Sequence, residues 1–132
     1  MAANTAPIFS ATPSVKWTAG ITAAANDYTG AGANNVTAFT AGSNGSFVQR
    51  LRFKALGTNV ATVARVFISS GTGGNSFMDE ISLPAITASA NTATASIDLP
   101  MNFAIPAGYT IIVGLGTAVA SGWLVSVIAG DY

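Results

Sequence analysis

The segment 47–56 contains an alternation of basic and apolar side chains, and this alternation constrains the fold more than any other feature of the sequence. The alternating residues at its centre are Arg50, Leu51, Arg52, Phe53 and Lys54. Successive side chains of a β-strand point to opposite faces of the sheet. The segment is therefore expected to form a strand that places Leu51 and Phe53 in a hydrophobic core and the three basic residues in water.

Seven further short segments are rich in β-branched and aromatic residues and are separated by turn residues. We expect strands at residues 14–18, 35–40, 61–70, 78–83, 95–103, 109–115 and 123–128. Strong helix formers do not recur at the spacing of a helix. About eight short strands predict a single all-β domain over residues 1–132, an antiparallel β-sandwich of the jelly-roll type. Residues 1 to about 13 are expected to form an extended N-terminal arm, and residues 20–32 a loop.

Four local features give more detailed expectations. The turn residues 57–59 suggest that the strands on either side of them form a hairpin. Pro100 indicates an edge position or a β-bulge, because proline cannot donate a hydrogen bond to a neighbouring strand. Trp17 and Trp123 lie in strand patterns and are expected in the core. The runs at 109–115 and 123–128 are almost continuously apolar, which predicts burial on both faces, by a second sheet or by another subunit.

Charged residues make up only 8% of the chain, where about 25% is typical. Either Thr, Ser and Asn provide the polar surface, or other subunits cover much of it, and we expect both. The chain is therefore predicted to form a homo-oligomer, with a trimer as the expected state. The candidate interface residues are Tyr109, Ile111, Val113, Trp123, Val125 and Val127.

The sequence lacks the residues of the common catalytic and metal sites. It contains no His and no Cys, and only five carboxylates. Asp79 and Glu80 are adjacent, so on a strand they face opposite sides and form no acid/base pair. The glycine-rich segments 71–74 and 114–116 lack the rest of a phosphate-binding motif. We therefore expect no catalytic residue, no cofactor and no metal.

Charge and hydropathy also limit the expected partners and location. The formal net charge is zero, so neither nucleic acid nor a membrane is an expected partner. Residues 109–130 are long enough to span a bilayer, but Gly114, Gly116 and Gly122 interrupt them, and two strands joined by a turn explain them better. The N-terminal residues have neither the basic nor the apolar region of a secretion signal, so no signal peptide is expected.

Two surface features could support binding. The basic face formed by Arg50, Arg52 and Lys54 is either a docking ridge for an acidic partner or a solvated strand face that discourages aggregation. An exposed aromatic residue could instead support a carbohydrate-binding module. These alternatives stay open at this point.

Several segments resemble small virion structural proteins of tailed bacteriophages. These are residues 50–58 (RLRFKALGT), 64–68 (ARVFI), 105–109 (IPAGY), the Leu99-Pro100 pair, and 13–17 (PSVKW). The resemblance implies a head decoration or cement protein, which binds the major capsid protein on the outside of the capsid, often as a trimer, and reinforces it. Its expected location is the capsid surface of the virion, after synthesis in the host cytoplasm. A small tail or fibre subunit is the alternative within the same class.

Overall fold

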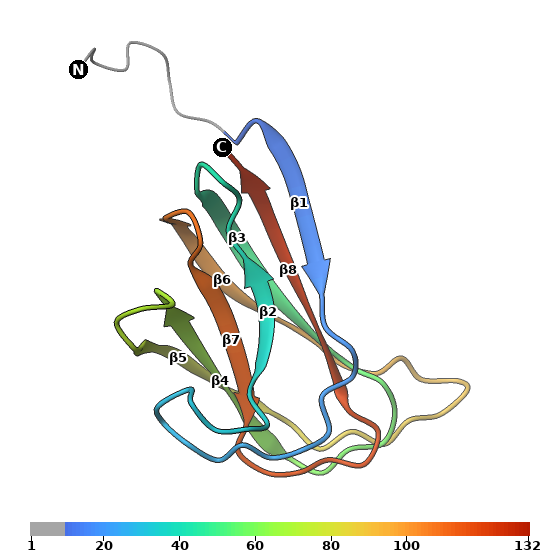
Figure 1. Cartoon of the computed structure of the whole chain (residues 1–132). Helices are drawn as coiled ribbons and strands as arrows, with labels where there is room; N and C mark the ends of the chain where they lie inside the picture. Colours follow the sequence, from blue (N-terminus) through green and yellow to red (C-terminus); the bar gives the residue numbers. More distant parts are fainter. Residues whose placement is uncertain (1–9) are drawn as a thin grey trace, which may run out of the picture.

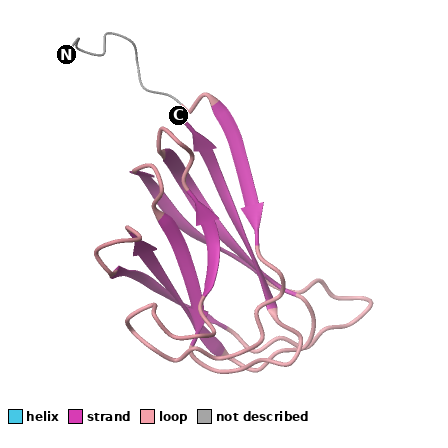
Figure 2. Cartoon of the chain, in the orientation of Figure 1, coloured by secondary structure: helices cyan, strands magenta, loops and turns pink. Residues whose placement is uncertain are grey.

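The computed structural model describes residues 10–132 as two antiparallel β-sheets of four strands each. Over these residues it contains strands and loops but no helix (Figure 2). The strands are β1 (Thr12–Trp17), β2 (Val36–Thr40), β3 (Ser46–Ala55), β4 (Thr62–Ser69), β5 (Asn75–Leu83), β6 (Ser96–Ile105), β7 (Thr110–Leu115) and β8 (Trp123–Asp131). The predicted all-β sandwich is confirmed, and each expected strand is present with bounds shifted by only a few residues.

Each strand of the first half of the chain pairs with a strand of the second half. Sheet A has the order β1-β8-β3-β6 and sheet B the order β2-β7-β4-β5 (Figure 1). The first strand pairs with the last, the second with the last but one, and so on inward, which gives the antiparallel pairs β1–β8, β2–β7, β3–β6 and β4–β5. Two further pairs, β3–β8 and β4–β7, complete the two sheets. Strands far apart in sequence are therefore neighbours, and the Ala11 amide donates to the Asp131 carbonyl at 2.8 Å.

The core lies between the two sheets. Phe53 and Trp123 of sheet A are fully buried, as are Val66 and Ile111 of sheet B. Along β3 the predicted alternation is confirmed from residue 50 onward, because Leu51 and Phe53 are buried while Arg52 is exposed. A β-bulge between Val48 and Arg50 shifts the alternation in the first part of the strand.

The predicted hairpin between β3 and β4 is wrong, because these strands belong to different sheets. The chain crosses from sheet A to sheet B through residues 56–61, and Asn59 holds this crossing. Its backbone exchanges hydrogen bonds of 3.0 and 2.8 Å with Ile86, and its side-chain oxygen accepts from the amides of Ser121 and Gly122 at 2.8 and 3.0 Å. The local turn signal was correct, but it does not specify which sheet the next strand joins.

Pro100 was expected at an edge position or at a β-bulge, and the structure shows both. The strand β6 lies at the edge of sheet A, and the β-bulge that shifts the β3–β6 register falls between the Val48–Phe103 and Arg50–Pro100 pairs. Asn102, which lies within this irregularity, has a φ of 53°. Asn tolerates this left-handed conformation better than most residues do.

The two tryptophans differ in their environment. Trp123 is fully buried, as predicted, whereas Trp17 is 67% exposed, so its predicted place in the core is wrong. Trp17 ends the edge strand β1 and pairs with Ser126, an outward-facing residue of β8. An apolar residue in a strand pattern reaches the core only when it lies on the inward face.

The predicted subunit interface also needs correction. Five of its six residues are fully buried inside the sandwich and have no surface to offer a partner; they are Ile111, Val113, Trp123, Val125 and Val127. Tyr109 is half-buried and packs against the same core. Strands β7 and β8 are thus buried completely on one face only. Most of the predicted N-terminal arm, residues 1–9, lies outside the described residues, and strand β1 already begins at Thr12.

Candidate functional site

The two outer faces of the sandwich differ in how they are covered. The loop between β1 and β2 crosses the outside of sheet B (Figure 1), where the amides of Ala25 and Asn26 both donate to the Leu115 carbonyl at 3.0 Å. Gly30 of this loop lies against the ring of Phe67, which is fully buried although it faces outward. Among residues 10–132, no loop covers the central strands on the outer face of sheet A, where the side chains of Arg50 and Arg52 are 39% and 47% exposed.

The uncovered face carries two parallel rows of side chains. Register places Trp17, Ser126, Arg52 and Asp98 in one row across the four strands, and Val15, Ile128, Arg50 and Pro100 in the next. Val15 is 46% exposed. The face therefore combines exposed apolar side chains on β1 with basic side chains on β3.

The basic residues on this face are partly neutralised. Arg52 donates to Asp98 twice, from Nε at 2.8 Å and from Nη2 at 3.1 Å, and Arg50 Nε lies 3.9 Å from the same carboxylate. The hydrogen bond from Arg52 lowers the pKa of Asp98, and the same pair raises the pKa of Arg52. Lys54 donates to the Thr94 carbonyl at 2.6 Å. Three positive charges face one negative charge, so the ridge remains cationic.

The same face is hollowed beside the ridge. An open hollow of about 360 Å³ is lined by Ser10, Pro13, Phe47, Gln49, Ile128, Ala129 and Gly130. A second, of about 260 Å³, is lined by Gln49, Arg50, Asp98, Pro100 and Asn102. Small-molecule sites usually enclose most of their ligand. Open hollows of this kind suit contact with a larger surface instead.

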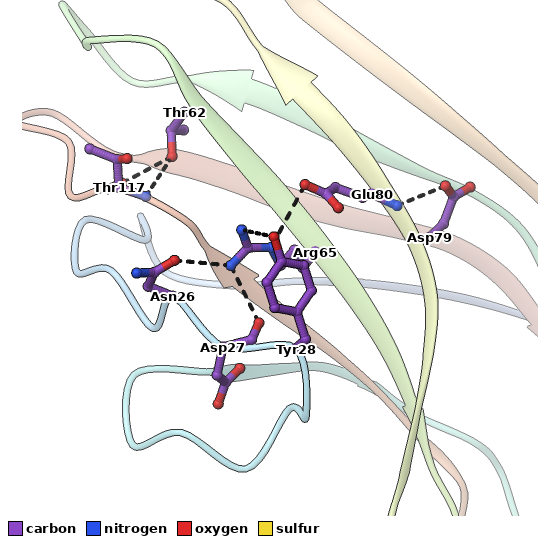
Figure 3. A network of polar contacts seen from close by, with 8 residues as sticks. All are labelled: Asn26, Asp27, Tyr28, Thr62, Arg65, Asp79, Glu80 and Thr117. Carbon is purple, nitrogen blue, oxygen red and sulfur yellow. Dashed lines mark hydrogen bonds and ion pairs between the residues drawn. The ribbon is translucent and has the colours of Figure 1, made fainter.

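On sheet B, the buried Arg65 is the centre of a polar network whose other members are partly or fully exposed (Figure 3). Its guanidinium lies 4.0 Å from the centroid of the Tyr28 ring and donates to the Tyr28 hydroxyl at 3.0 Å. It also donates to Asn26 Oδ1 and the Asp27 carbonyl, and its Nε lies 3.7 Å from Glu80. These contacts attach the β1–β2 loop to sheet B, which gives Arg65 a structural role.

Asp27 organises the same loop. Its carboxylate accepts hydrogen bonds from the amides of Gly30 and Gly32, from the Thr29 hydroxyl and from the Asn35 side chain. The Asn35 bond, followed by those from Gly32 and Gly30, holds the pKa of Asp27 below its ordinary value despite the opposing effect of burial. The carboxylate is thus occupied by its own loop.

The remaining carboxylates do not converge. Asp79 and Glu80 pair with Val66 and Arg65, so they face opposite sides of β5, as expected. Within residues 10–132 no three His, Cys, Asp or Glu side chains come together as metal ligands. Over the same residues no helix is long and apolar enough to cross a membrane.

Sequence reasoning placed the three basic residues on one outer face but missed that Val15 and Trp17 share it. The signal available was Pro13, because proline favours an edge strand, whose side chains are less completely covered. A comparison with protein-family models finds no match, and a search of curated proteins finds none either. The resemblance to phage virion proteins therefore stays a prediction.

Proposed function

We propose that this chain is a non-enzymatic virion structural subunit of a tailed bacteriophage. In this proposal it assembles as a homo-oligomer, with a trimer as the expected state, on the outside of the head. There it binds the major capsid protein and stabilises the capsid. The observation that carries the proposal is the uncovered outer face of sheet A, where a cationic ridge lies beside exposed apolar residues.

The strand pairing supports the jelly-roll form of the sandwich. In a jelly roll a long antiparallel hairpin is rolled into two sheets, so the first strand pairs with the last, the second with the last but one, and so on. The pairs β1–β8, β2–β7, β3–β6 and β4–β5 follow this order. Jelly rolls occur in viral capsid and lectin domains.

The residue types on the face support a protein partner. Trp and Arg are enriched among the residues that dominate binding energies at interfaces. Trp17 and Arg52 lie in one cross-strand row, separated by Ser126 of β8. An acidic partner surface would complement the excess positive charge, which increases the rate of association more than the affinity.

The test is attachment to undecorated capsids by a variant with Gln at Arg50, Arg52 and Lys54. We expect about a tenfold slower association at low salt. The association rate of the wild type should fall steeply as salt is added, because exposed charges are screened over about 8 Å at physiological ionic strength. The association rate of the variant should depend only weakly on salt. Unchanged rate and salt dependence would leave the ridge as a solvated strand face.

Asp98→Asn provides a matched control on the same face. It removes the one negative charge that pairs with Arg50 and Arg52, so attachment should become faster rather than slower. Denaturant midpoints close to the wild-type value would show that both variants are folded.

A carbohydrate-binding module is the second candidate, and the exposure of Trp17 favours it. The ring is 67% exposed and lies in a row with Ser126 and Arg52, which provide polar groups beside an aromatic platform. Glycan-array binding at sub-millimolar affinity that is lost in Trp17→Ala would support this function. Co-purification with capsids and no glycan binding would favour the virion subunit over it.

A further inference from the structure

The exposed apolar side chains gather on two edge strands. The strands β1 and β5 each end one sheet and lie on opposite sides of the sandwich (Figure 1). Seven large apolar side chains are exposed among residues 10–132, and four of them belong to these two strands. They are Val15 and Trp17 on β1, and Phe77 and Met78 on β5.

Each of these edges carries exposed charge of one sign. Lys16 lies between Val15 and Trp17 on β1, with its side chain on the opposite face of the strand, whereas Asp79 and Glu80, which also point to opposite faces, follow Met78 on β5. Glu80 lies 3.7 Å from Arg65, but in the described part of the chain neither Lys16 nor Asp79 has an ion-pair partner. We call residues 15–17 the basic edge and residues 77–80 the acidic edge.

The signs of these charges select among the possible contacts between copies of the chain. Contact between two basic edges brings Lys16 against Lys16, and contact between two acidic edges brings Asp79 and Glu80 against themselves. Like charges oppose both arrangements, whereas a basic edge against an acidic edge is complementary. Single charges on edge strands usually only prevent aggregation. Opposite signs on opposite sides also favour one specific contact.

We propose that the acidic edge of one copy of this chain docks against the basic edge of a second copy, head to tail. This inference deepens the self-association in the proposed function and rests on it. The apolar contact would bring Phe77 and Met78 together with Val15 and Trp17. Phe77 is already held in place, since the centroid of its ring lies 5.4 Å from that of Phe67 and 5.5 Å from that of Tyr28.

A head-to-tail contact uses two different surfaces of the subunit, so it repeats. It closes into a ring if the rotation between neighbours allows closure, and otherwise it continues as a filament. The contact also leaves the basic ridge on β3 outside the two edges. In this arrangement Val15 and Trp17 belong to the contact between copies, and the basic ridge of β3 is the part of the outer face of sheet A that is left to bind a particle.

The test is sedimentation velocity of the chain alone, with no particles present. Trp17→Ala should weaken self-association by about thirtyfold or more, because an exposed Trp is the kind of residue that dominates an interface. Lys16→Asp and Asp79→Lys should each weaken it by about fivefold at low salt. The double variant K16D/D79K should regain most of the lost association, because the complementary pair is restored with its signs exchanged.

Val60→Ala is the matched control. Val60 is 57% exposed but lies in the β3–β4 crossing, away from both edges, so its removal should leave self-association unchanged. A wild-type chain that stays monomeric up to about 1 mM would overturn the inference. So would unchanged association in Trp17→Ala, or a double variant no better than the single ones.

The two proposals fail in different ways. Self-association that follows these substitutions in a chain that does not attach to capsids would contradict the proposed function alone. Capsid attachment by a chain whose self-association ignores the substitutions would contradict the head-to-tail contact alone.

Discussion

Residues 52 and 53 show how strongly the position of a single side chain depends on the pleat of its strand. Phe53→Ala removes a fully buried ring and should lower the free energy of unfolding by about 3–5 kcal/mol. Arg52→Ala removes an exposed side chain and should cost far less, even though it breaks the pair with Asp98. Denaturant midpoints of the two variants measure the difference. Equal losses would contradict the register of β3.

The two tryptophans provide a second test at this scale. Trp17 should emit at long wavelength and be quenched by acrylamide, because most of its surface meets water, whereas the buried Trp123 should emit at shorter wavelength and resist quenching. Trp17→Phe isolates the emission of Trp123. If the remaining emission were still readily quenched, the burial of Trp123 would be contradicted.

Individual residues were predictable only where a pattern fixes the inward direction. The alternation at residues 50–54 did so, because charged residues mark the outward face of β3. The segments 109–115 and 123–128 contain no charged residue to mark an outward face, so sequence reasoning assigned Ile111 and Val125 to a subunit interface when they belong to the core. Trp17 was misplaced because hydrophobicity does not distinguish a central strand from an edge strand.

At the scale of elements, the loop between β1 and β2 depends on Asp27. Asp27→Asn weakens the hydrogen bonds to Gly30 and Gly32, and we expect a loss of about 1–2 kcal/mol at pH 7. Folding lowers the pKa of Asp27 from 3.8, so the ionised carboxylate stabilises the folded state fully above that pH. This stabilisation is lost as the pH falls through the pKa that Asp27 has in the folded state. The difference between variant and wild type should therefore shrink as the pH falls below 3.8 toward the lowered pKa of the folded state.

Urea unfolding of the variant and the wild type, at pH 7 and at a pH below 3.8, measures this difference in stability. Asp79→Asn is the control, since within residues 10–132 the Asp79 carboxylate accepts a hydrogen bond only from the amide of its neighbour Glu80, at 2.7 Å, and should give a smaller loss at pH 7. A difference for Asp27→Asn that stays the same at both pH values would mean that the carboxylate charge does not hold the loop.

The strands themselves were predictable because their signals are local. β-branched runs and turn residues indicate where each strand begins and ends, and Pro100 even indicated the irregular edge strand β6. Strand partners were not predictable in the same way. The β3–β4 crossing depends on Asn59 meeting Ile86 and residues 121–122, which are distant in sequence and leave no mark near residues 57–59.

At the scale of the whole molecule, the pairing of the two halves of the chain determines how it folds. Thr12 pairs with Asp131 and Trp17 with Ser126, so sheet A is completed only when the two ends of the chain meet. Contacts between distant residues require the entropy of loop closure before they stabilise the fold. We expect refolding in milliseconds to seconds, as for other β-sandwiches, which stopped-flow fluorescence can measure.

A circular permutant tests this explanation. Its natural ends would be joined, because Ala11 and Asp131 are in backbone contact, and new ends would be opened among the exposed residues 87–93 between β5 and β6. The join turns the β1–β8 pair into a local contact, so the permutant should keep the spectrum of the native fold and refold faster. The cut lies between the partners of four further pairs: it lengthens the chain between β3 and β6 and between β4 and β7, and it shortens the chain between β2 and β7 and between β3 and β8. The shortening of the β1–β8 connection is the largest of these changes. Slower refolding with unchanged stability would show that closing the β1–β8 pair does not limit the rate.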